Sequence, residues 1–143
     1  MNETNAVVTR TFSSLEVGET ASMERRITSN DVNAFAELSG DYNPLHVDEA
    51  FAASALFGKR VVHGMFLGSL VSQLVGMKLP GRYALLLKVE LEFKKPAFID
   101  DTVIVRGTLT TKSMATKIIE IKVSITREQE LVTTGKVHVQ VLA

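Results

Sequence analysis

The second half of the chain alternates apolar and polar residues with a period of two. The runs Leu85–Phe93, Val103–Val105, Ile119–Ile125 and Val137–Val141 each place an apolar residue at every other position. This periodicity is typical of β-strands that bury one face. The segments between the runs are short, which predicts an antiparallel meander.

The beginning of the chain predicts a strand followed by a helix. Residues 21–27 can form the strand, and residues 28–38 carry apolar positions on one helical face. Thr28 is suited to cap that helix, because Asp31 follows three residues later in an arrangement close to a capping box. Gly40 can end the helix.

Two further helices are predicted before the strands begin. Residues 41–47 are expected to be irregular, since Pro44 interrupts regular pairing. A short helix over 49–54 follows. Residues 64–77 then form a long helix that is apolar on most sides, so other structure should surround it. The simplest arrangement is an α+β fold in which the sheet wraps around this helix.

Length and charge narrow the class of protein. The 143 residues suggest one domain over 13–143, with residues 1–12 disordered or extended. Lysine plus arginine and aspartate plus glutamate both number 16, and this balance argues against a nucleic-acid partner. The chain has no cysteine, which excludes disulfides, thiolate catalysis and cysteine-ligated zinc.

No targeting or membrane segment is expected. The first residues lack the basic region and apolar run of a signal peptide. The most apolar stretch, 61–79, is interrupted by His63, three glycines, Gln73 and Lys78, so it is a poor membrane span. We therefore expect a cytoplasmic protein.

The three histidines differ in their promise as catalytic groups. His138 lies in mid-strand on the polar face and is expected at the surface. His63 directly precedes the long helix, where anchoring the helix start competes with a catalytic role. His46 shares the irregular segment with Asp41, and the two can converge across the proline turn. The alternative is an Asx-turn at Asp41 and a solvent-exposed His46.

Gly64 opens the long helix and is a candidate ligand-binding position. A glycine there lets a ligand approach the backbone, and the free N–H groups of a helix start favour developing negative charge. Gly64, Gly68 and Ser72 also repeat every four residues, which indicates close helix packing, and both interpretations can hold. The chain has no phosphate-binding glycine pattern and no metal-ligand spacing, so no metal is expected.

Three segments together resemble a known family. The stretch 39–46, SGDYNPLH, resembles the signature of MaoC-like dehydratases and (R)-specific enoyl-CoA hydratases. The stretch 62–65, VHGM, opens an apolar helix with Ser69 and Ser72, and resembles a second motif of the family. The stretch 93–98, FKKPAF, with 101–103 after it, resembles the strand that follows. The resemblance covers about residues 14 to 143.

The resemblance implies a hot-dog fold and a homodimer with active sites at the subunit interface. It implies that Asp41 and His46 are the catalytic pair and that the Gly64 N–H binds the thioester oxygen. Ser72, Asn43 and His63 are expected near the substrate. No cofactor is implied.

The implied reaction is the reversible hydration of a trans-2-enoyl thioester to an (R)-3-hydroxyacyl thioester, carried by CoA or acyl carrier protein. Two alternatives stay open. A hot-dog thioesterase would attack C1 instead of C3. A non-catalytic acyl-binding domain would be expected to carry a partner domain or to have lost Asp41 or His46, and neither is seen.

Overall fold

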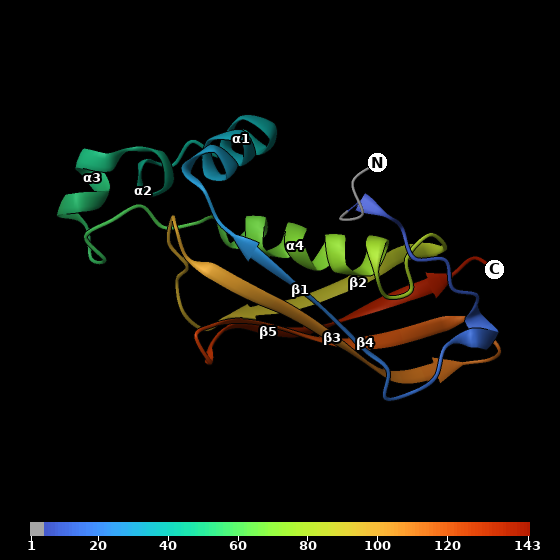
Figure 1. Cartoon of the computed structure of the whole chain (residues 1–143). Coiled ribbons are helices and arrows are strands. Elements are labelled where there is room, and N and C mark those ends of the chain that lie inside the picture. Colours follow the sequence, from blue (N-terminus) through green and yellow to red (C-terminus); the bar gives the residue numbers. More distant parts are fainter. Residues whose placement is uncertain (1–4) are drawn as a thin grey trace.

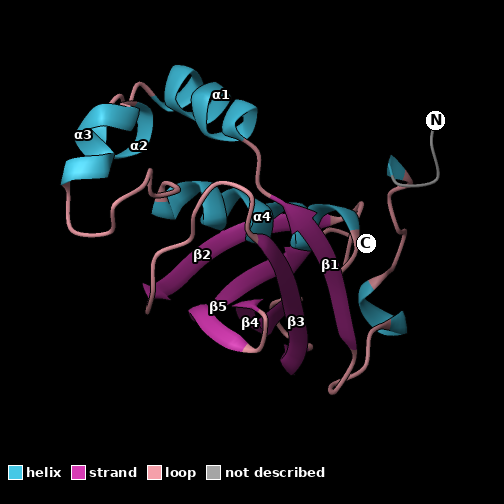
Figure 2. Ribbon diagram, turned by 60° about the vertical axis from the view of Figure 1, so that its left-hand side comes forward, coloured by secondary structure: helices cyan, strands magenta, loops and turns pink. Residues whose placement is uncertain are grey.

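The computed structural model describes residues 5–143, and in it one helix lies along one face of a single sheet (Figures 1 and 2). The elements are η2 (Phe12–Ser14), β1 (Thr20–Arg26), α1 (Ser29–Ser39), α2 (Pro44–Val47), α3 (Glu49–Ser54), α4 (Gly64–Met77), β2 (Ala84–Phe93), β3 (Thr102–Ser113), β4 (Ile118–Arg127) and β5 (Glu130–Val141). The predicted α+β arrangement is therefore confirmed.

The five-stranded sheet is antiparallel throughout, in the order β1-β3-β4-β5-β2. The prediction of a simple meander holds for β3, β4 and β5 and is wrong for β2, which lies at the far edge. The physical reason is the path of the chain: α4 runs over the sheet and returns the chain beside β5, where the Leu142 N–H donates to the Tyr83 carbonyl. β1 occupies the place beside β3.

The alternation along β2 is interrupted, contrary to expectation. Leu86 pairs with Val139 and Lys88 with His138, with a register shift between them. Leu86 and Val89 therefore lie opposite buried β5 residues, whereas strict alternation from Leu85 would have placed Leu86 on the polar face. A bulge inserts one residue into a strand, so period-two counting cannot continue across it.

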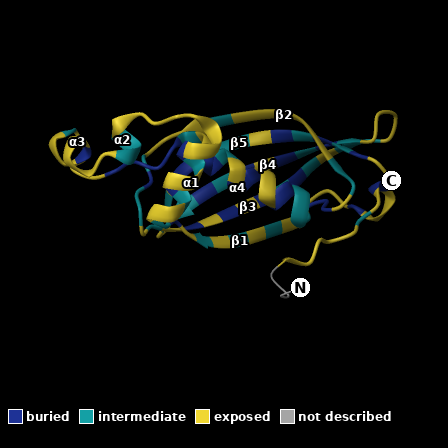
Figure 3. Cartoon of the chain, turned by 90° about the horizontal axis from the view of Figure 1, so that it is seen from above, coloured by how far each residue is buried: buried dark blue, intermediate teal, exposed yellow. Residues whose placement is uncertain are grey.

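The core lies between α4 and the inner face of the sheet (Figure 3). Leu70, Val71 and Leu74 of α4 pack with buried residues of β3, β4 and β5. Gly107 lets α4 approach closely, because a Cβ there would lie 2.9 Å from a Leu74 methyl group. Along β3 and β4 the residues that face away from the helix are more exposed, as the period-two pattern predicts, whereas β2 is exposed along most of its length.

The helices α2 and α3 lie beyond one end of the sheet, and α1 lies above that end on the same side as α4 (Figures 1 and 3). The predicted capping box at the start of α1 is confirmed, and Gly40 ends the helix in the left-handed conformation. The irregular segment predicted over 41–47 contains a short helix, so that prediction was partly wrong. Pro44 is its first residue, where a missing N–H costs nothing, and the Asn43 side chain caps it.

The N-terminal stretch runs as an extended segment beside the end of α4. The Val8 N–H donates to the Met77 carbonyl, and the Arg82 N–H donates to the Val8 carbonyl. Phe12 is buried. Residues 1–4, which the prediction of disorder or extension also covered, lie outside the described residues. Within residues 5–143, each helix is too short or too polar to span a bilayer.

Candidate active site

The imidazole of His46 is held in one orientation by a hydrogen bond to the backbone. His46 belongs to α2, its side chain is 15% exposed, and its Nδ1 lies 2.6 Å from the Val61 carbonyl oxygen. Because a carbonyl oxygen only accepts hydrogen bonds, Nδ1 carries the proton of the neutral ring. Nε2 therefore presents its lone pair, 3.9 Å from the Asp41 Oδ2.

Asp41 occupies an Asx-turn and still faces His46. Its Oδ1 accepts a hydrogen bond from the Asn43 N–H at 3.1 Å, and its backbone N–H donates to the Ser39 hydroxyl. The side chain is 51% exposed, which leaves Oδ2 free toward His46. The two interpretations of this segment therefore combine: the Asx-turn is present, but His46 is not solvent-exposed.

His63 supports both of these residues from beneath. It is 2% exposed, and its Nε2 lies 3.0 Å from the Asp41 carbonyl oxygen. Its ring stacks on His46 with 3.9 Å between centroids, and the Phe35 ring meets it edge-on. Its Nδ1 is buried without a hydrogen-bond partner among the described residues. These contacts agree with the anchoring role weighed for His63.

A pocket of about 330 Å³ extends from His46 between α4 and the end of β2. Gly64 and Leu67 line it on the helix side, and residues 93–97 line it on the other. Phe93 and Ala97 give an apolar wall, whereas Lys94 and Lys95 add two cations. The pocket can therefore receive an apolar chain whose polar end lies beside His46.

Gly64 opens α4 and packs against Phe93, whereas the ligand-binding role expected for its N–H stays a prediction. It is the first residue of α4, so no carbonyl within the helix can accept from its N–H. A Cβ at this position would lie 3.2 Å from the ring of Phe93, so the absence of a side chain also permits close packing. His46 and Gly64 line the same pocket, and Asp41 reaches it only through its contact with His46.

Comparisons with known proteins identify the family and the fold. The family model described as "MaoC like domain" matches residues 13–131, which is most of the chain. The chain belongs to the MaoC-like domain family. The family predicted from the three sequence motifs is thereby confirmed, and so is the hot-dog fold.

Several relatives of this MaoC-like chain carry names. It is 50% identical over 90 residues to the (R)-specific enoyl-CoA hydratase of Aeromonas caviae, covering 63% of this chain and 67% of that protein. It is 34% identical over 132 residues to the (R)-specific enoyl-CoA hydratase of Rhodospirillum rubrum, covering 92% of each. The solved structure of the A. caviae (R)-hydratase superposes with a TM-score of 0.87, covering 90% of this chain and 98% of that one.

Ser72 and Asn43 lie outside the pocket of this MaoC-like chain. Ser72 is exposed on α4, two turns beyond Gly64 and so about 12 Å along the helix axis. The Asn43 side-chain oxygen accepts from the Leu45 N–H at 2.9 Å. Asn43 thereby shapes the turn that holds Asp41. The substrate-binding roles expected for both residues stay predictions.

Asp41, His46 and His63 offer possible metal-ligand atoms within 4.8 Å of one another, a cluster that the sequence spacing did not predict. The geometry suits proton transfer better than metal binding. The two rings stack with an interplanar angle of 25°, and the Nδ1 of His46 is already occupied by the Val61 carbonyl. His63 also directs Nε2 to the Asp41 carbonyl, which requires the proton to be there.

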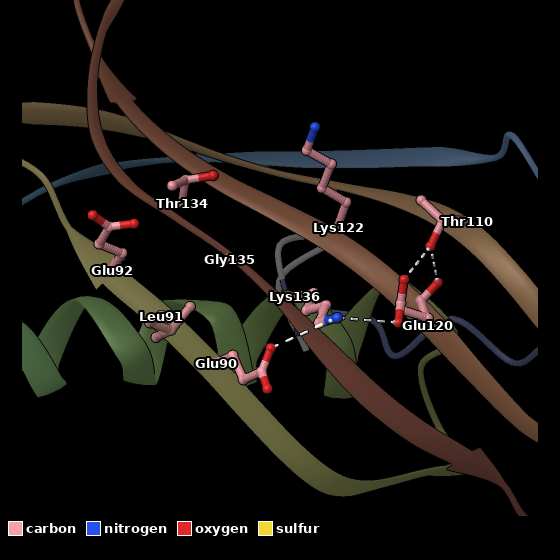
Figure 4. Close-up of a pocket in the computed structure, with 9 residues that line it drawn as sticks. All are labelled: Glu90, Leu91, Glu92, Thr110, Glu120, Lys122, Thr134, Gly135 and Lys136. Atoms are coloured by element: carbon pink, nitrogen blue, oxygen red, sulfur yellow. Dashed lines mark hydrogen bonds and ion pairs between the residues drawn. The ribbon is translucent and has the colours of Figure 1, made fainter.

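A second hollow, of about 420 Å³, lies on the outer face of the sheet (Figure 4). Three of the charged residues that line it lie together, since Lys136 lies 3.8 Å from Glu90 and 3.9 Å from Glu120. A hydrogen bond from His138 lowers the pKa of the Glu120 carboxyl. Ion pairing and hydrogen bonds of this kind favour the ionised carboxylates, so Glu90 and Glu120 are poorly suited to donate a proton near neutral pH.

Sequence reasoning missed two residues that shape the site. Phe93 covers Gly64, and Arg60 is 7% exposed beneath α2 with its guanidinium on the His46 carbonyl. The local signal for Arg60 was weak: two adjacent cations, Lys59 and Arg60, precede Val61-Val62 and His63, and nothing in that pattern distinguishes one from the other. The partners of Arg60 lie up to 27 residues away, so only the fold reveals what it contacts.

Proposed function

We propose that this protein reversibly hydrates trans-2-enoyl-CoA thioesters to (R)-3-hydroxyacyl-CoA thioesters, with Asp41 and His46 as the catalytic pair. The observation that carries the proposal is the placement of His46: its Nδ1 lies on the Val61 carbonyl, and its Nε2 lies 3.9 Å from the Asp41 carboxylate at the end of a mostly apolar pocket. The named relatives are (R)-specific enoyl-CoA hydratases, which favours hydration over the thioesterase alternative.

The spacing of the pair suits one water molecule. A distance of 3.9 Å is too long for a direct hydrogen bond, but a water oxygen about 2.8 Å from both atoms fits between them. One group removes a proton from this water as its oxygen bonds to C3. The electrons of the C2–C3 double bond move toward the thioester carbonyl, and C2 then receives a proton on the same face. The two groups titrate as one unit, so the acid and the base are not assigned individually.

The Gly64 N–H is proposed to stabilise the enolate oxygen of this reaction. It opens α4, where unpaired N–H groups and the helix dipole favour negative charge. A single donor of this kind is worth about 2.7–4 kcal/mol in comparable oxyanion sites. A Cβ at this position would lie 3.2 Å from the Phe93 ring, so any side chain there would have to shift that ring in the pocket wall.

We further propose that the protein acts as a homodimer joined along β2. This strand is an edge of the sheet, and its exposed apolar side chains include Val89 at 43% and Phe93 at 44%. Met65, on the neighbouring face of α4, is 63% exposed. An unpaired edge beside an apolar surface favours a second strand, and Phe93 places the substrate pocket next to that edge. The cytoplasmic location and the single domain over 13–143 stay predictions.

Crotonyl-CoA provides the decisive test. Loss of the enoyl absorbance with formation of (R)-3-hydroxybutyryl-CoA is expected, with no release of free CoA thiol. Release of the thiol from crotonyl-CoA, with the enoyl group intact, would instead identify a thioesterase. Saturable binding with neither reaction would identify an acyl-binding domain.

A further inference from the structure

Arg60 joins three helices around the proposed catalytic histidine. Its Nε donates to the His46 carbonyl at 2.5 Å, and its Nη2 donates to Asn33 Oδ1 of α1 at 2.6 Å. Its Nη1 lies 3.5 Å from Glu49 of α3, whose side chain is 82% exposed. The two close bonds therefore go to neutral oxygens, and the ion pair with Glu49 is weak.

One of these bonds belongs to a clasp, by which we mean the hydrogen bonds that join residues 45–46 to residues 60–61. The Val61 N–H donates to the Leu45 carbonyl at 3.1 Å, and the His46 ring donates back to the Val61 carbonyl. Arg60 adds the bond to the His46 carbonyl. α2 has only four residues, so its last carbonyls lack partners within the helix. Arg60 supplies a partner for the carbonyl of the catalytic residue itself.

We propose that Arg60 is the positioning residue for His46: it holds α2 against residues 60–61, so that the imidazole Nε2 stays directed at Asp41. This inference rests on the proposed function for its catalytic consequence. Arg60 touches neither the pocket nor the reacting atoms, and it acts through the backbone of His46.

The geometry requires a guanidinium and not merely a positive charge. The His46 carbonyl and the Asn33 side chain are bonded by different nitrogens of one planar group. A lysine ammonium is a single point on a flexible stem and cannot reproduce this fork. A methionine leaves both oxygens without their donor. Arg60→Lys and Arg60→Met should therefore both loosen α2.

The test combines kinetics with a spectrum that needs no substrate. In both variants, kcat on crotonyl-CoA should fall about 10- to 100-fold, while KM changes little, because a misplaced catalytic group affects the reacting geometry more than binding. The chain has only three histidines, so ¹⁵N-histidine spectra can be assigned one residue at a time. Wild-type His46 should show a protonated Nδ1 and an unprotonated Nε2. The variants should show a mixture of tautomers.

Arg10→Met is the matched control. Arg10 also donates to a backbone carbonyl, that of Ser14 at 2.5 Å, and pairs with Glu19 at 2.8 Å. These contacts lie in and beside the N-terminal segment. The control should lower the melting temperature but leave kcat and the His46 spectrum unchanged.

A milder variant covers the case in which Arg60→Met fails to fold. Asn33→Ala removes one of the two close acceptors of Arg60 from an exposed position. Its His46 spectrum should shift in the same direction, by less. Wild-type spectra and kcat in both Arg60→Lys and Asn33→Ala would overturn the inference. A shifted spectrum in a protein without hydratase activity would reject the proposed function and leave the positioning role standing.

Discussion

Asp41 and His46 face each other across a gap that one water molecule fits, so each should be needed for proton transfer. We expect Asp41→Asn and His46→Gln each to lower kcat on crotonyl-CoA by roughly 10²- to 10⁴-fold, the usual contribution of acid–base catalysis. KM should move little, since the acyl chain is held by the pocket and the lost interaction acts in the transition state.

The double variant distinguishes a catalytic pair from two independent residues. When two groups act as a unit, removing either one removes most of their joint contribution to kcat. The variant that combines Asp41→Asn with His46→Gln should therefore have a kcat only slightly below that of the less active single variant. Both single variants keeping near wild-type kcat in steady-state assays would remove the site assignment.

His63 is a residue whose effect should appear mainly in stability. His63→Gln keeps a side-chain N–H that can reach the Asp41 carbonyl but loses the stacking on His46 and the contact with Phe35. We expect a lower melting temperature and a smaller loss of kcat than for His46→Gln. Thermal unfolding and kinetics on one preparation measure both, and a loss of kcat as large as that of His46→Gln would give His63 a catalytic role.

The sequence identified the candidate site residues but did not determine their geometry. Asp41 and His46 could be selected because they share a turn, but the sequence offered the Asx-turn and the convergent pair as alternatives. The structure contains both, since Asp41 uses one carboxylate oxygen for each. The tautomer of His46 was beyond sequence reasoning, because it is set by the carbonyl of Val61, fifteen residues further along the chain.

The capping-box residue Asp31 at the start of α1 makes the stability of the protein depend on pH. Burial alone would raise the pKa of the Asp31 carboxyl, but hydrogen bonds from the Thr28 N–H and the Arg25 guanidinium outweigh it, so the pKa is lowered. The folded state therefore binds this proton less readily than the unfolded chain. The resulting stability is present above the ordinary carboxyl pKa of about 4 and is lost as the pH falls through the lowered value.

Asp31→Asn should accordingly destabilise the protein at pH 7 and have a smaller effect in acid. Urea midpoints at pH 7 and at about pH 3 measure the difference. Asp100→Asn is the control, because Asp100 pairs with Arg26 where both side chains are about two-thirds exposed, and such pairs contribute little. An equal loss in Asp31→Asn at both pH values would contradict the coupling.

Individual strands and helices could be predicted from the sequence, whereas the order in which the strands pair could not. Period-two runs located β2 to β5, and the capping box located α1, because both signals are local. The place of β2 at the far edge depends on how α4 carries the chain across the sheet. The bulge between Leu86 and Lys88 likewise depends on the pairing with β5, which no local pattern contains.

At the scale of the whole molecule, the β2 edge should decide assembly. Val89→Lys places a charge in the apolar edge, and we expect it to give monomers with little hydratase activity in sedimentation and kinetic experiments. Ile104→Lys is a matched control, since Ile104 is 41% exposed against 43% for Val89 but belongs to β3. A wild-type protein that is monomeric at micromolar concentration would count against the dimer.

The hydrogen bonds between residues 45–46 and 60–61 also hold the two ends of residues 47–59 together, so that this segment forms a closed surface branch. Insertions in this segment should therefore be tolerated, because lengthening a closed surface loop costs little folding free energy. A short Gly/Ser insertion after Leu56, which is 89% exposed, should leave kcat on crotonyl-CoA unchanged. The same insertion between Asn43 and Pro44 should abolish activity. This branch is therefore where recognition of new substrates or partners could be added while the reaction centre stays insulated.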